Sequence, residues 1–72
     1  MDVETKRANF KRLAEKRTQT IIDELRILTN LTNTSNYEYD EEDVKKIFSA
    51  IESAVKKAKK EFNKELNSKF KL

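Results

Sequence analysis

The chain carries two largely apolar stripes whose spacings are mirror images of each other. The first consists of Phe10, Ala14, Thr18, Ile21, Leu25 and Leu28, and the second of Val44, Phe48, Ile51, Val55, Ala58 and Phe62. Within each stripe the residues recur every three or four positions, which is the period of an amphipathic helix. When the chain is folded back on itself, position 10 meets 62, 21 meets 51 and 28 meets 44. The pattern therefore predicts an all-α protein in which two long antiparallel helices form a helical hairpin.

This interpretation makes residues 1–72 a single domain, with helices over about 3–29 and about 40–67 and a turn over about 30–39. Because the chain has no Gly and no Pro, a residue with positive φ in the turn would have to be one of its Asn residues. Asp40 is expected to cap the second helix, with Asp43 completing an acidic form of the capping box. Tyr39 and Val44 are placed to form a hydrophobic staple around this cap.

A hairpin of two helices has one apolar seam and no second layer, so its stability in isolation is marginal. A further apolar flank consists of Leu13, Ile27 and Leu31 on the first helix and Ile47, Ala50 and Ala54 on the second. In an antiparallel pair the two parts of this flank point to the same side. The flank predicts a homodimer that forms an antiparallel four-helix bundle. The alternative is that these residues widen the core of a single hairpin.

The net charge of +3 conceals an asymmetry along the hairpin. Residues 1–17 and 55–72, which we call the basic open end, hold 13 Lys or Arg against 5 Asp or Glu, a balance of +8. Residues 18–54 hold 3 against 8, a balance of −5. The cations of the open end are candidates for contact with the phosphates of DNA or RNA, free or in a nucleoprotein complex. The candidates are Lys6, Arg7, Lys11, Arg12, Lys16, Arg17, Lys56, Lys57, Lys60 and Lys64. Because such residues also occur on solvated helical faces, a purely solubilising role is the alternative.

A different class of function would use the other end of the hairpin. Asn33, Asn36 and Tyr37 form a candidate partner-binding tip beside the acidic cluster of residues 38–43. They suggest a protein-binding adaptor or inhibitor that needs no nucleic acid. Helix capping and the helix dipole explain the acidic cluster equally well. A stand-alone structural bundle is the third possibility.

Composition argues against an enzyme, a cofactor and a metal site. The chain has no Cys and no His, which removes thiolate chemistry, the usual proton shuttle and the commonest metal ligand. So thin a fold offers no pocket for a small-molecule substrate. No stretch reaches the roughly 18 apolar residues of a membrane span, and residues 1–4 lack the apolar segment of a signal peptide. We therefore expect a cytoplasmic protein that does not engage membranes.

The turn region resembles a recurrent pattern in small, uncharacterised helical proteins of Gram-positive bacteria and their mobile elements. The residues that carry the likeness are Leu25–Asn33, Asn36–Tyr39 and Asp43–Glu52. The resemblance implies a helical hairpin and a plasmid, transposon or prophage setting. It implies no catalytic or binding residues.

Overall fold

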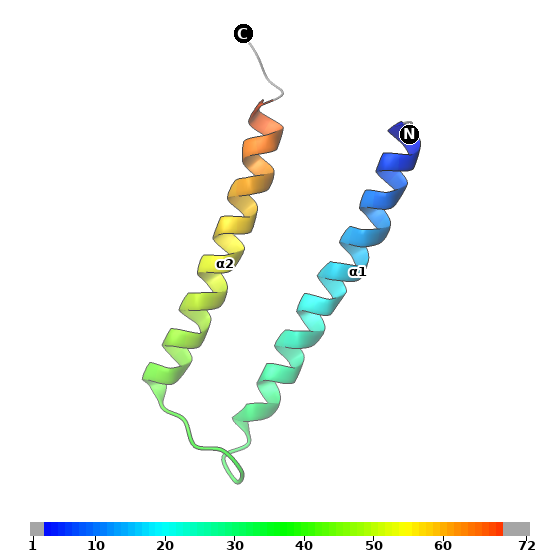
Figure 1. Ribbon diagram of the computed structural model, residues 1–72. Coiled ribbons are helices and arrows are strands. Elements are labelled where there is room, and N and C mark those ends of the chain that lie inside the picture. The colour runs from blue at the N-terminus through cyan, green and yellow to red at the C-terminus, as the bar shows by residue number, and fades with distance from the viewer. Residues whose placement is uncertain (1–2, 69–72) are drawn as a thin grey trace. The chain divides into compact units, whose positions relative to one another are not determined.

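The computed structural model describes residues 3–68, which are helical on both sides of a short connector. Helix α1 spans Val3–Thr29, the 3-10 turn η1 spans Asn30–Thr32, and helix α2 spans Glu41–Ser68 (Figure 1). No strand occurs among these residues. The prediction of an all-α protein with two long helices is thereby confirmed. The helices belong to two separate units, with the boundary between Tyr37 and Glu38.

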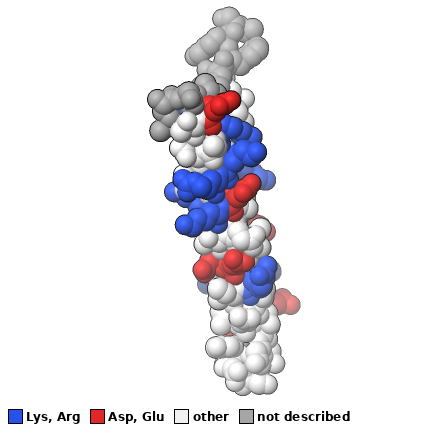
Figure 2. Space-filling model, turned by 90° about the vertical axis from the view of Figure 1, so that its right-hand side faces the viewer, with Lys and Arg blue, Asp and Glu red and all other residues white. Residues whose placement is uncertain are grey.

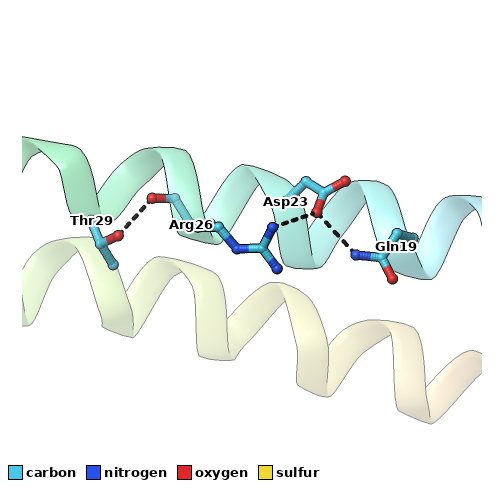
Figure 3. Close-up of polar contacts among 4 residues, drawn as sticks. All are labelled: Gln19, Asp23, Arg26 and Thr29. Carbon is cyan, nitrogen blue, oxygen red and sulfur yellow. Dashed lines mark hydrogen bonds and ion pairs between the residues drawn. The ribbon is translucent and has the colours of Figure 1, made fainter.

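Helix α1 runs without interruption through a cluster of β-branched residues that favours helix only weakly. Local side-chain contacts support it there. The Thr20 hydroxyl donates a hydrogen bond to the Lys16 carbonyl at 3.0 Å. Asp23 accepts one from the Gln19 amide at 3.0 Å and pairs with the Arg26 guanidinium at 3.4 Å (Figure 3). These contacts lie on exposed surface, where each contributes only a few tenths of a kcal/mol to about 1 kcal/mol.

The end of α1 passes into η1 by tightening its last turns. The Thr29 hydroxyl donates to the Arg26 carbonyl at 2.6 Å (Figure 3), and the Thr32 hydroxyl donates to the Thr29 carbonyl at 2.8 Å. Asn33 then leaves the helical region with φ −69° and ψ 100°. None of the described residues has a positive φ. The connector therefore does not need a left-handed Asn: the 3-10 turn ends at an extended Asn33 with negative φ.

The start of α2 is the acidic capping box expected from the sequence. The Asp43 backbone N–H donates to the Asp40 carboxylate at 2.9 Å, and the Asp40 backbone N–H donates to the Asp43 carboxylate at 3.1 Å. The reciprocal pair satisfies two donors at the helix N-terminus. Glu41, Glu42 and Asp43 also occupy the first turn, where negative charge interacts favourably with the helix dipole. The predicted cap at Asp40 is confirmed.

Replacement of the cap gives the first test of this local structure. Asp40→Ala removes the acceptor for the Asp43 N–H, so the free energy of unfolding is expected to fall by about 1 kcal/mol. Urea unfolding followed by circular dichroism measures the change. Asp40→Asn keeps a side-chain acceptor and should retain most of the stability. Glu42→Ala is the charge-matched control, and a loss as large as that of Asp40→Ala would show that charge, not the cap, stabilises this terminus.

Neither helix buries any of its own side chains. No residue between 4 and 67 is buried, and large apolar side chains of both stripes are extensively exposed, including Ile21 at 60% and Phe62 at 61%. The apolar surface of each helix is therefore available for packing. Within residues 3–68, no helix has the combined length and apolar character needed to cross a membrane.

Candidate nucleic-acid interface

The candidate cations occupy one part of each helix. Six lie in the N-terminal part of α1 and four in the C-terminal half of α2. All ten side chains are exposed. Figure 2 shows Lys and Arg side chains gathered at the height of the N-terminal part of α1 in the face that it draws. Among the described residues none of the ten forms an ion pair, since the ion pair found there joins Asp23 and Arg26.

On α2 the four candidate lysines form a coherent face. Lys56, Lys60 and Lys64 follow one another at intervals of four, and Lys57 lies one turn before Lys60. The apolar stripe from Val44 to Phe62 lies on the opposite side of the helix, because its members are offset from these lysines by about half a turn. The helix therefore separates its cationic surface from its apolar surface.

Two further lysines on this side of α2, Lys45 and Lys46, directly follow the acids of the first turn of the helix and lie outside the basic open end. Lys45, Lys46, Ser49 and Ser53 line an open hollow of about 540 Å³ together with Ala50. A helical-wheel projection of the second helix alone would have shown that its lysines cluster on one side. The cations of α2 thus share one side of a helix instead of surrounding it.

The cations of α1 are arranged differently. Arg12 and Lys16 project opposite the apolar stripe of that helix, whereas Lys11 and Arg17 lie on its two flanks. Arg7 lies within the stripe, where its guanidinium carbon is 5.8 Å from the centre of the Phe10 ring. At this distance the cation interacts with the ring face by about 0.5–1 kcal/mol at an exposed site. The α1 cations therefore surround the helix, as a solvated segment also would.

The candidate tip is organised mainly by its own backbone. Asn33 is the centre of the turn: its side-chain oxygen accepts a hydrogen bond from the Ser35 N–H at 3.0 Å. Its carbonyl oxygen accepts two more, from Asn36 N–H at 3.1 Å and Tyr37 N–H at 3.0 Å. These bonds give Asn33 a structural role that accounts for its presence. Tyr37 is 48% exposed, so its ring is accessible at the surface.

The acidic cluster beside the tip is also explained locally, since Asp40 and Asp43 cap α2. In the part of the chain that the structure describes, no three acidic side chains are grouped so that they could hold a metal ion.

The candidate dimer residues are accessible on both helices. Ile27 is 57% exposed, Leu31 45% and Ile47 38%. Ala50 and Ala54 are exposed as well, and Leu13 is half-buried. On α2, Ile47, Ala50 and Ala54 share one face, because they are separated by three, four and seven residues. This face is adjacent to the apolar stripe and remains open for packing.

The described residues form two long helices with exposed apolar surfaces, and α2 also carries a cationic face. Comparison with protein-family models, curated proteins and solved structures found no match.

Proposed function

We propose that the chain is a small, non-enzymatic interaction protein, a helical-hairpin homodimer that contacts nucleic acid or a nucleoprotein complex through its basic open end. The observation that carries the proposal is the set of exposed cations that form no ion pair within the described residues. A solubilising surface mixes charges of both signs, whereas the segment 56–60 holds four lysines and no acid. Such a segment attracts polyanions.

Self-association is supported by the amount of apolar surface on each helix. Phe10, Ile21, Phe48 and Phe62 are each more than 40% exposed, and such side chains gain roughly 1.5–3 kcal/mol apiece on full burial. The mirrored stripes match each other when the helices run antiparallel. The flank of Ile47, Ala50 and Ala54 then remains for a second copy, which completes a four-helix bundle.

The mode of contact follows from the residue types. Lys and Arg on helical surfaces bind phosphate oxygens, and such contacts position a protein without reading base sequence. Phe10, Phe48 and Phe62 belong to the apolar stripes, so they are not available to stack on bases. Binding should therefore be insensitive to sequence and strongly dependent on salt.

We favour this function over an adaptor that acts through the tip. The hydrogen bonds of Asn33 and the capping bonds of Asp40 and Asp43 account for the tip residues as structural elements. Among residues 3–68, no comparable local contact accounts for Lys56, Lys57 and Lys60.

The proposal is tested by titrating binding of a short DNA duplex, and of an RNA of equal length, against salt. Each neutralised phosphate contributes a slope of about −0.9 to log Kobs against log salt for a DNA duplex. With four or more contacts, affinity should fall by roughly 100-fold or more between 0.05 and 0.2 M salt. The double substitution Arg12→Gln and Lys60→Gln should make the slope shallower by about 1–2.

A matched control removes one Arg from α1 and one Lys from α2 outside the basic open end. Arg26→Gln combined with Lys45→Gln makes the same change in charge. Lys45 follows the acids of the first turn of α2, which repel phosphate, so this variant should leave the slope nearly unchanged. Equal effects of the two double variants would show that net charge alone drives binding. Absence of binding at low salt by a correctly folded protein would refute the nucleic-acid function and favour the adaptor.

A further inference from the structure

One edge of α2 carries the same motif near both of its ends, an acid followed three residues later by a lysine. Asp43 and Lys46 lie toward the start of the helix, and Glu61 and Lys64 lie toward its end. All four side chains are exposed. Within the described residues none of them forms an ion pair. Between them on the same edge lie Ile47, Ala50, Ala54 and Lys57, so the two acid–lysine pairs flank the apolar patch at both ends.

The order of these charges is self-complementary when two copies of α2 run in opposite directions. With the two-fold axis between Ser53 and Ala54, Asp43 of each copy faces Lys64 of the other, and Lys46 faces Glu61. Both pairings occur in the same register, and symmetry produces each of them twice. In a parallel, in-register pair every one of these residues would instead face its own like charge, which is destabilising.

The cap at the start of α2 is compatible with this arrangement. One carboxylate oxygen of Asp43 accepts the Asp40 N–H, and a carboxylate has further acceptor sites for a lysine. In the same register Lys57 faces Ala50, whose small side chain leaves room for the aliphatic stem of the lysine. Ala50 and Ala54 allow the two helices to approach closely.

We propose that two copies of the chain associate through this edge, with their α2 helices antiparallel and the axis near Ala54. The inference rests on the self-association in the proposed function and adds its partner surface and orientation. It is independent of whether nucleic acid is bound. Because the two α2 helices run in opposite directions, the lysines of residues 56–64 of one copy and those of the other lie at opposite ends of the shared edge.

Charge reversal tests the pairing. Lys46→Glu alone and Glu61→Lys alone each replace two attractions by two repulsions, so each should raise the dimer dissociation constant about tenfold at low salt. The double variant, with both reversals, restores the pairing and should return the constant close to its original value. Lys45→Glu, which makes the same charge change off this edge, is the control. Sedimentation equilibrium measures all four variants.

Single cysteines test the orientation, since the chain has none of its own. Ala54→Cys, beside the axis, should form an interchain disulfide readily. Glu61→Cys should not, because its two copies lie about 22 Å apart along the antiparallel helices. Crosslinking of both variants at equal rates would overturn the antiparallel arrangement, as would a double reversal that fails to restore association. A monomer that still binds DNA would refute the dimer but support the nucleic-acid function. A dimer that binds no DNA would support the dimer and refute the nucleic-acid function.

Discussion

Ile51→Asp is expected to remove most of the helical circular dichroism of the protein. Ile51 lies in the middle of the second apolar stripe and is half-buried on α2. In the proposed hairpin, the substitution forfeits roughly 1.5–3 kcal/mol of apolar burial, and placing a carboxylate between the two stripes adds a desolvation cost of about 1–3 kcal/mol or more. A small domain with a single core has only about 3–5 kcal/mol of stability. One substitution in the seam is therefore enough to unfold it.

Ser49→Asp is the matched control for this prediction. Ser49 lies two residues before Ile51 on the lysine-bearing side of the same helix and away from the edge proposed to pair with a second copy, so the same new charge stays in water there. Helical content should remain near that of the original chain. If Ile51→Asp left the helical signal intact, the apolar stripe would not be the structural core, and the two helices would be stable without packing along it.

Much of the local structure could be predicted from the sequence because its causes are local. The apolar period and the absence of Gly and Pro indicated long helices, and α1 and α2 are present. Asp40 and Asp43 have the spacing of a capping box and form both of its hydrogen bonds. Each of these features depends on residues within one or two turns of one another.

The connector was less predictable because several backbone solutions compete there. The sequence allowed a left-handed residue only at an Asn, and the described residues turn without any positive φ. The hydroxyls of Thr29 and Thr32 bond back to carbonyls one turn earlier, and Asn33 closes the turn by accepting three backbone N–H groups. Propensity identifies the residues that turn, but not which of these bonds form.

The sequence predicted which cations make up the candidate site, but only partly how they are arranged around the two helices. Charge counts located the cations in residues 6–17 and 56–64. The lysines of α2 share one face, and a helical-wheel projection of the predicted second helix alone would have found it; counting the cations of both helices together obscured it. On α1 the cations surround the helix, and Arg7 packs over Phe10. The two helices therefore offer different kinds of basic surface.

A disulfide between the two stripes is the second prediction with an all-or-none outcome. Folding the chain about its middle places Ala14 opposite Ala58. Both are small residues on the stripes. Because the chain has no native Cys, the double variant Ala14→Cys and Ala58→Cys has two thiols, which can form only one intrachain disulfide. If the helices pair antiparallel in this register, the two Cβ atoms approach to within the roughly 3.5–4.5 Å that a disulfide requires.

Ala14→Cys combined with Ala50→Cys is the control, since it displaces one partner by about 12 Å along α2. The central claim of this account is that the mirrored stripes pair with each other within one chain. Formation of intrachain disulfide in dilute redox buffer, followed by mass spectrometry, tests it most directly. The account predicts rapid closure of the 14–58 pair and little closure of the 14–50 pair. Equal closure of both pairs, or closure of neither, would contradict the antiparallel hairpin.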